Sequence, residues 1–325
     1  MLRFNATKLG LYDGTRCAIV ATVHSRDPWP GCSSFLVALL LLSFARAGFA
    51  QSPFIQPVQP PLVEAAVEPD PPSLWRKEWP QFRSSEGIAM VAAGVATGLI
   101  VLYGPIEQPR WRGGILFDDV VRDGVRPSSA STRKTYRTIG DWTYRLSPLI
   151  PLVDALVVST LGHHDKKLAL NLAAITFEAY SYSGLASFVA TEVSARARPD
   201  TDPHCIGSNC NVDTQSFFSG HTAISATGAG LVCANHTRIP LYGNVIADAA
   251  ACVFATTNAL VTGTTRVVAD RHYASDVITG FGLGFAAGYA VPVLLHYSSS
   301  RDGVSVSLAP DPSCGPSCIG MRGTF

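Results

Sequence analysis

Apolar residues gather along this chain in six long runs that short polar connectors separate. The runs are rich in alanine and glycine and show little of the two-residue alternation typical of strands. Each is expected to form one helix, and they lie at 88–104, 146–162, 168–190, 222–234, 244–264 and 277–297. The pattern predicts an all-α bundle of about six core helices, with short irregular N- and C-terminal extensions.

The same runs leave open whether this helical domain, expected at 86–297, spans a membrane. Charged residues make up 15% of the chain and the mean hydropathy is +0.21, apolar for a soluble enzyme but mild for a polytopic membrane protein. Most runs have the length of a span, whereas 222–234 is short enough to be a buried core helix. Asp154, Glu178 and Asp248 are interpreted as polar contacts inside the bundle in either setting. Membrane association is the favoured interpretation.

The ends of the chain have their own composition. Residues 33–50 form an apolar run that ends in small residues, which is typical of a secretory signal peptide; an uncleaved anchor helix is the alternative. We expect 1–50 to be one of these, with a doubtful start codon, 51–85 to be a Pro-rich linker, and 298–325 to be a tail. With six spanning helices and a periplasmic site, the first helix must start in the cytoplasm. A cleaved signal peptide would instead place its start outside, so the two predictions conflict. Either the anchor remains, or the first helix does not span, or the bundle is a soluble or membrane-associated periplasmic domain.

Cysteine spacing favours an oxidising compartment. Two pairs flank short loops and suit disulfides, with free thiols as the alternative. These pairs are Cys205 with Cys210 and Cys314 with Cys318. No His/Cys set has the spacing of a zinc site, and no metal is expected. Cys233 and Cys252 lie in apolar runs and are expected to be core residues.

Three short segments in the C-terminal half carry residues suited to phosphate chemistry. Forked guanidinium donors neutralise phosphate oxygens, and amides at a helix start favour anions. One histidine can be the nucleophile and another the general acid. The segments are Arg198-Pro199, then Ser219-Gly220-His221, then Arg266 with His272 and Asp276.

The connectors place these segments together. Arg198 follows the third predicted helix, His221 opens the fourth, and 266–276 joins the fifth to the sixth. In an up-down bundle all three therefore lie at one end. Asp276 follows His272 by four residues, so on a helix its carboxylate can orient the imidazole ring.

Basic residues at the opposite end suggest an orientation. The connectors there hold Lys166, Lys167 and Arg238, which favours a cytoplasmic location for that end. The site would then face the periplasm from a bacterial-type inner membrane, or the whole domain would be periplasmic. The net charge of +1 gives no indication of a nucleic-acid partner, and the oligomeric state is not predicted.

The three segments resemble the type 2 phosphatidic acid phosphatase (PAP2) superfamily, which also contains the vanadium haloperoxidases. That family's pattern is Lys, six residues, Arg-Pro; then Pro-Ser-Gly-His; then Ser-Arg, five residues, His, three residues, Asp. Order and internal spacing match at 191–199, 218–221 and 265–276, here called the first, second and third motif segments. The resemblance extends over 88–297.

The chain departs from the family pattern at three positions. Phe218 replaces the proline and Thr265 replaces the serine, and both changes are mild. Thr191 replaces the lysine, which in the family adds a positive charge to the phosphate cradle. Arg196 and Arg271 are the candidates for a substitute charge; weakened activity and altered substrate choice are the alternatives.

The resemblance implies a metal-independent phosphatase without a cofactor, which hydrolyses a phosphomonoester or diphosphate through a phosphohistidine. His272 would attack phosphorus, Asp276 would hold the imidazole, and His221 would protonate the leaving oxygen and then help to activate water. The residues implied to bind phosphate oxygens are Arg198, Arg266, Ser219 and Gly220.

Four functions remain open at this stage. Apolar helices favour a lipid phosphate or diphosphate as substrate. A soluble periplasmic acid phosphatase is the alternative if the bundle does not span a membrane. A vanadium-dependent haloperoxidase would use the same oxyanion site, and a degenerate member would only bind phospholipid.

Overall fold

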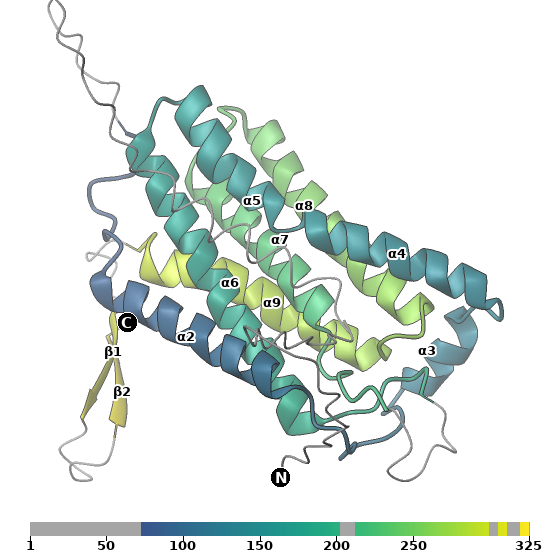
Figure 1. Cartoon of the computed structure of the whole chain (residues 1–325). Coiled ribbons are helices and arrows are strands. Elements are labelled where there is room, and N and C mark those ends of the chain that lie inside the picture. Colours follow the sequence, from purple (N-terminus) through teal and green to yellow (C-terminus); the bar gives the residue numbers. More distant parts are fainter. Residues whose placement is uncertain (1–72, 202–211, 299–304, 311–318, 325) are drawn as a thin grey trace, which may run out of the picture. The chain divides into compact units, whose positions relative to one another are not determined.

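The computed structural model describes residues 73–201, 212–298, 305–310 and 319–324 (Figure 1). By its internal contacts the chain divides into Met1–Val67 and Glu68–Phe325, so every described residue belongs to the second unit. The predicted signal peptide or anchor, most of the linker, and the Cys205/Cys210 and Cys314/Cys318 pairs lie outside the described residues.

The described core is a bundle of helices, and the predicted all-α class is confirmed. The helices are α2 (Ser84–Tyr103), α3 (Asp118–Val125), α4 (Ala130–Leu146), α5 (Leu149–Val153), the π-helix η1 (Asp154–Gly162), α6 (Lys166–Ser194), α7 (Gly220–Arg238), α8 (Val245–Val268) and α9 (Ala274–Leu295). Five of the six predicted helices correspond to α2, α6, α7, α8 and α9. In the C-terminal extension, β1 (Ser305–Pro310) pairs with β2 (Ile319–Thr324) as an antiparallel hairpin, so this part of the tail is not irregular.

The second predicted helix begins earlier than its apolar run. A continuous helical stretch of 33 residues covers Ala130–Gly162 and joins α4, α5 and η1. The side chain of Ser129 caps its start by accepting a bond from the Thr132 amide, although the first half of α4 is polar. Much of the polar stretch between the first two predicted helices is therefore helical, because a good cap and tertiary contacts with α8 outweigh the polar composition.

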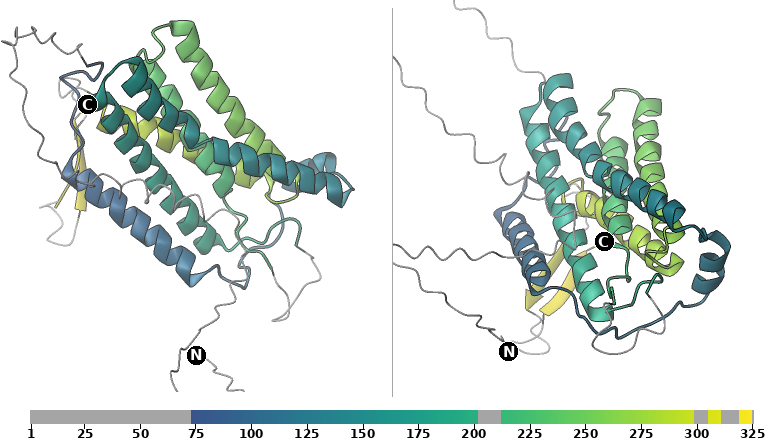
Figure 2. Two further views of the ribbon diagram at one scale, coloured as in Figure 1. Left: turned by 45° about the horizontal axis from the view of Figure 1, so that its top comes forward. Right: turned by 45° about the vertical axis from the view of Figure 1, so that its right-hand side comes forward.

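Helix α7 lies among α6, α8 and α9 (Figures 1 and 2). Small residues allow α9 to approach it closely, since Gly280, Gly284 and Gly288 recur every four residues. A methyl group at Gly284 would overlap the backbone carbonyl of Ala223, and one at Gly288 would overlap that of Thr227. This contact fixes the start of α9 beside the start of α7.

Replacing Gly284 with alanine should therefore destabilise the fold. Backbone atoms cannot move aside as a flexible side chain can, so we expect a loss of about 3 kcal/mol in the free energy of unfolding. Gly282→Ala is the matched control, because nothing lies within 4 Å of the added methyl group. Thermal unfolding of both variants in one detergent tests this, and equal melting temperatures would contradict the packing described.

The end of the bundle away from the motif segments contains buried ion pairs. His236 is buried, with Nδ1 2.6 Å from Asp248 and Nε2 3.2 Å from Asp154. Glu178 accepts a 2.7 Å bond from His296. The three carboxylates are thus polar contacts inside the bundle, as their positions in apolar runs indicated.

Two further contacts differ from expectation. Cys233 and Cys252 form a disulfide between α7 and α8, whereas sequence predicted only core residues. Residues 73–83, the end of the predicted linker, pack against the bundle: Trp75 and Trp79 are buried beside Tyr297. Neither contact had a local signal, because each depends on residues distant in sequence.

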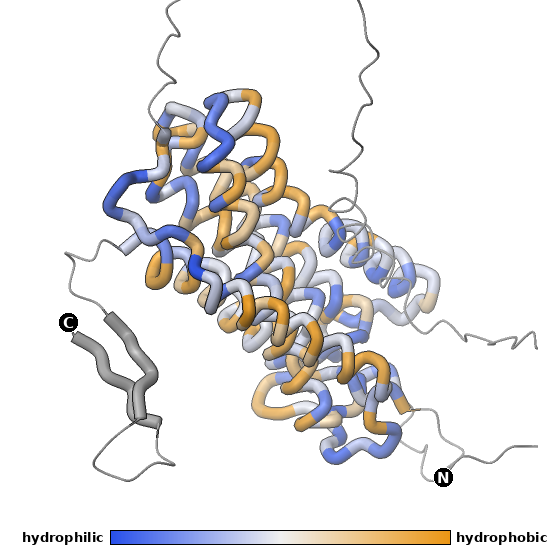
Figure 3. Tube along the Cα trace, turned by 60° about the vertical axis from the view of Figure 1, so that its left-hand side comes forward, coloured by the Kyte–Doolittle hydropathy of each residue, from blue (hydrophilic) through white to orange (hydrophobic). Residues whose placement is uncertain are grey.

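Four helical stretches are long and apolar enough to cross a membrane: Ser84–Tyr103, Ala130–Gly162, Val245–Val268 and Ala274–Leu295. Many of their large apolar side chains face outward, including Leu99 and Leu102 on α2, Phe254 on α8 and Leu283 on α9. Figure 3 shows hydrophobic residues along the length of several helices. Apolar surface of this extent is unfavourable in water and favourable in lipid. These helices therefore support a membrane protein.

Candidate active site

The three motif segments meet at one end of the bundle. Helices α6 and α8 end there, while α7 and α9 begin there. The Ser219 amide donates to the Asp276 carbonyl at 3.1 Å, which joins the second segment to the third. Arg198 Nη1 donates to the Arg271 carbonyl at 3.3 Å, which joins the first segment to the third. Residues separated by up to 78 positions therefore share one site.

His272 lies in the loop between α8 and α9 and is 2% exposed. Its Nδ1 donates to the Ser216 carbonyl at 2.8 Å, and this assigns the ring lone pair to Nε2. Among the described residues Nε2 has no hydrogen-bond partner, although it is buried. Burial, together with the positive charges of Arg198 and Arg266, holds the His272 pKa well below its usual 6.5. The ring is therefore neutral and its Nε2 is free to attack.

This low pKa predicts activity in acid. A histidine whose pKa is lowered keeps its lone pair as the pH falls through its ordinary range, so kcat/KM should not decline at pH 6.5 because of His272. The test is a kcat/KM profile from about pH 4 to about pH 8, corrected for the separately measured ionisation of the substrate. A decline centred at pH 6.5 that remains after correction would contradict the environment described.

Asp276 does not bond the His272 ring directly. Its Oδ2 lies 3.9 Å from His272 Nδ1, and instead accepts bonds from Ser216 Oγ at 2.6 Å and the Tyr273 amide at 2.9 Å. Ser216 thus connects the two, since its hydroxyl bonds Asp276 while its carbonyl holds the ring. The direct contact expected from the i, i+4 spacing is replaced by this bridge.

The predicted phosphate-binding arginines are both buried beside His272. Arg198 Nε lies 2.8 Å from an Asp213 oxygen, and Arg266 Nη1 lies 2.7 Å from Asp141. Arg266 Nε is buried and has no hydrogen-bond partner in the described part of the chain. Each guanidinium therefore has donors beyond those its carboxylate occupies, which suits it to bind an oxyanion.

The second segment forms the start of α7. Ser219 is the N-cap: its hydroxyl accepts from the Thr222 amide at 3.4 Å and from the Thr222 hydroxyl at 2.9 Å. Its side chain therefore already has a structural role. Gly220 is the first helical residue, so its amide is among those an α-helix leaves for an anion.

His221 contacts a carboxylate that the sequence analysis missed. Its Nε2 lies 3.4 Å from Asp141 Oδ1, the atom that also accepts from Arg266. The ring of Tyr144, one turn further along α4, lies 4.4 Å away between centroids. Asp141 can thus orient the His221 ring. Burial and the charge of Arg266 lower the His221 pKa to about 3, so the ring is neutral until an anionic phosphate offsets these charges.

The position of the missing lysine carries no charge. Thr191 lies on α6 and its hydroxyl donates to the carbonyl of Ser187 at 2.9 Å. Of the two candidate substitutes, Arg271 binds Asp200 at 2.6 Å and Asp213 at 2.9 Å. Since Asp213 also binds Arg198, Arg271 belongs to the arginine cluster around the site. Arg196 faces a different set of partners, described below.

Helix α3 connects to the loops that carry the site (Figure 1). Arg122 bonds both oxygens of Asp270, at 2.6 Å and 3.0 Å, and Arg126 bonds one at 2.5 Å. Arg122 also donates to the Pro199 carbonyl at 2.6 Å. Asp270 is therefore paired with two arginines of α3, and these ion pairs hold the first and third segments in place.

Three polar residues of the site had no sequence signal. Asp141, Asp213 and Ser216 lie outside the motif segments and reach them only through long-range contacts. Asp141 is part of the polar stretch before the second predicted helix. Asp213 and Ser216 stand in the long connector between the first two segments, where no spacing rule marks them.

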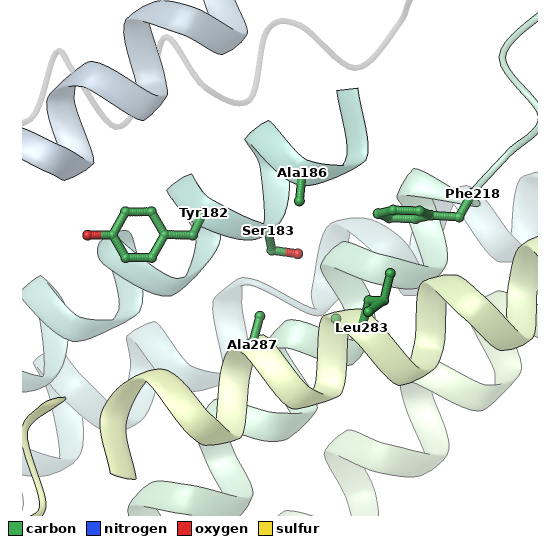
Figure 4. A pocket seen from close by; sticks show the side chains of 7 residues that line it. Tyr182, Ser183, Ala186, Phe218, Leu283 and Ala287 are labelled. Carbon is green, nitrogen blue, oxygen red and sulfur yellow. The ribbon is translucent and has the colours of Figure 1, made fainter. Parts of the chain in front are cut away.

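An apolar groove of about 240 Å³ lies between α6 and α9. Figure 4 shows Ser183 and Ala186 of α6 facing Leu283 and Ala287 of α9, with Phe218 at one end. Phe218 directly precedes Ser219, so the groove begins next to the start of α7. Ala186 and Leu283 are exposed on the bundle surface, and the groove therefore opens sideways.

Comparison with known proteins identifies the class of protein. Residues 169–300 match the model of the PAP2 superfamily, and this range contains all three motif segments. The chain therefore carries a PAP2 superfamily domain and is a phosphoric-ester hydrolase of PAP2 type, as the resemblance predicted.

The other comparisons add little. No curated protein sequence matches the chain. One solved structure is similar, described as the first transmembrane PAP2 type phosphatidylglycerolphosphate phosphatase from Bacillus subtilis. It is 19% identical with a TM-score of 0.40, and the match covers 65% of this chain and 94% of that chain. A likeness this distant carries no argument about substrate.

Proposed function

We propose that this protein hydrolyses a phosphomonoester or diphosphate of a lipid through a phosphohistidine on His272. The observation that carries the proposal is the buried Nε2 of His272, which has no partner among the described residues and lies near two buried arginines and His221. A neutral imidazole beside positive charges suits attack on an anionic phosphorus centre. Guanidinium and amide donors supply charge stabilisation, so the chemistry needs no metal.

The reaction would have two steps. His272 Nε2 forms a bond to phosphorus while the bond to the leaving oxygen breaks, and His221 gives that oxygen a proton. His221 then takes a proton from water as the water attacks phosphorus, and the N–P bond breaks. Arg198 and Arg266 would hold the phosphate oxygens in both steps, together with the Gly220 amide.

A lipid substrate is supported by the groove between α6 and α9. It is apolar, opens on the bundle surface, and begins beside the predicted phosphate-binding residues Ser219 and Gly220. The part of one lipid hydrocarbon chain nearest the phosphate would fit in this groove while the headgroup reached the arginines. The four candidate spans support the same proposal, because helices of this length and apolar composition suit a lipid bilayer.

The test compares a lipid with a soluble substrate. Purified protein in nanodiscs is given phosphatidic acid, a polyprenyl diphosphate and p-nitrophenyl phosphate, with EDTA present. Ala186→Phe should fill the groove and raise KM for the preferred lipid about tenfold. The reason is that the phenyl ring displaces part of the lipid chain, which then loses its buried apolar contact area. It should leave p-nitrophenyl phosphate hydrolysis unchanged.

The matched control is Leu170→Phe, an exposed apolar position on the same helix outside the groove. Equal KM values for Ala186→Phe and wild type would reject the groove as a chain-binding site. Hydrolysis of p-nitrophenyl phosphate alone would favour the soluble acid phosphatase alternative.

We also propose that the site faces the periplasm of a bacterial-type inner membrane. The cysteine pair between the first two motif segments suits a disulfide, which would need an oxidising compartment on that side. The Cys233–Cys252 disulfide lies nearer the other end of α7 and does not indicate a side. Lysines and arginines do not decide the orientation. The site end carries Arg110, Arg112, Arg133, Lys134 and Arg137, which balance the basic residues of the opposite end. Reporter fusions at the η1–α6 connector and after Asp213 test the orientation directly.

A further inference from the structure

Arg196 is a fully buried cation that holds two carboxylates. It is 0% exposed; Nη1 donates to Asp276 Oδ1 at 2.5 Å and Nη2 donates to Asp118 Oδ2 at 2.8 Å. Aromatic rings lie near its guanidinium, with the Trp111 centroid at 3.9 Å and the Tyr273 centroid at 4.0 Å. Such a guanidinium is fixed in position and excluded from water.

One of these carboxylates is connected to the nucleophile. Asp276 Oδ2 accepts from Ser216 Oγ, and the Ser216 carbonyl holds His272 Nδ1. The other, Asp118, comes from the start of α3 and accepts from the amide and the hydroxyl of Ser275, at 2.8 Å and 2.7 Å. A chain of contacts therefore runs from α3 through Arg196 to the catalytic ring.

The charges of this cluster do not cancel. By formal charge, Asp118 and Asp276 are two negative groups and Arg196 is one positive group, so the buried cluster has a formal charge of −1. His272 is otherwise faced by two arginines, Arg198 after α6 and Arg266 on α8, and by His221 on α7. On the α9 side, Asp276 supplies the negative charge that the ring meets.

We propose that Arg196 and Asp118 are positioning residues for the nucleophile: Arg196 fixes Asp276 behind the His272 ring, and the charge of Asp118 gives the cluster the excess that stabilises a positive ring. This proposal rests on the proposed phosphohistidine mechanism. When Nε2 bonds phosphorus and the leaving-group bond breaks, the ring keeps its Nδ1 proton and gains positive character. A nearby net negative charge stabilises that state more than the neutral ring before attack.

The test separates charge from geometry with two variants. Asp118→Asn removes the excess charge and keeps an acceptor for the Ser275 amide. Its Nδ2 replaces the oxygen that accepts from Arg196, so the melting temperature of this variant is compared with that of wild type. It should slow phosphoenzyme formation about tenfold and move the acid limb of kcat/KM down by about half a pH unit, because a protonated His272 loses stabilisation. Arg196→Lys keeps the charge but cannot bridge two carboxylates, so it should lower kcat about tenfold without moving the limb.

Asp119→Asn is the matched control, since this adjacent carboxylate on α3 is exposed. It should change neither quantity. Asp118→Ser makes the same charge change if the asparagine variant does not fold. All rates are measured on p-nitrophenyl phosphate by rapid quench, with substrate ionisation cancelling between variants.

An acid limb that stays in place in Asp118→Asn would overturn the charge role, and wild-type kcat in Arg196→Lys would overturn the positioning role. A rate loss in Asp118→Asn without a shift of the limb would indicate a purely structural ion pair. If wild-type protein hydrolyses substrate but forms no phosphoenzyme on His272, the proposed function fails first, and this outcome is distinct from the others.

Discussion

Replacing His272 with glutamine should lower kcat by about 10⁴-fold or more on every substrate, because glutamine has no nucleophilic nitrogen and the other histidine of the site, His221, is held by Asp141. Glutamine approximates the size of the ring and can still donate to the Ser216 carbonyl, so the site should remain assembled. The measurement is phosphate release by purified protein under saturating substrate. Substrate binding should weaken far less than kcat, since Arg198 and Arg266 remain.

Two results would contradict this expectation. Residual kcat within about tenfold of wild type would show that water attacks phosphorus directly, with His272 only assisting. Loss of activity together with loss of the folded state would not support a catalytic role, so melting temperatures are compared. His163→Gln is the matched control, because that histidine lies at the opposite end and bonds the Leu241 carbonyl.

His221→Ala should have an effect that depends on the leaving group. A lipid alkoxide needs a proton as it departs, so kcat on phosphatidic acid should fall about 10³-fold. p-Nitrophenolate departs without a proton, so phosphoryl transfer to His272 from p-nitrophenyl phosphate should be nearly unaffected. Hydrolysis of the intermediate should slow, because His221 also helps to activate water.

Rapid mixing of the variant with p-nitrophenyl phosphate measures this directly. A burst of one p-nitrophenolate per protein, followed by a slow steady rate, is expected. Equal losses on both substrates, without a burst, would show that His221 binds phosphate and does not transfer protons. Asp141→Asn should produce a milder form of the same pattern, since Asp141 orients His221 and remains close to Arg266.

Much of the site could be predicted because its chemistry is local in sequence. Arg198, His221 and His272 stand in short segments with fixed spacing, and alternating helices place the ends of those segments together. The helical runs were recognisable because each is long and apolar. Their boundaries were within a few residues, except where a polar stretch joined an apolar one at α4.

The supporting shell was not predictable, because its contacts are long-range. Asp118 and Asp276 are separated by 158 positions yet meet on Arg196. Nothing in the local sequence distinguishes Arg196 from Arg271 as a substitute for the lost lysine, and the structure directs Arg196 to Asp276 and Arg271 to Asp213. Burial and charge balance, which decide these partners, are properties of the folded chain.

The most direct test of the central claim is to trap the covalent intermediate. His221→Ala protein is mixed with p-nitrophenyl [³²P]phosphate, denatured in alkali and digested, and the labelled peptide is sequenced by mass spectrometry. The proposed mechanism predicts acid-labile label on His272 and no label in the His221→Ala/His272→Gln double variant. Label on another residue, or label that survives in the double variant, would contradict a phosphohistidine on His272.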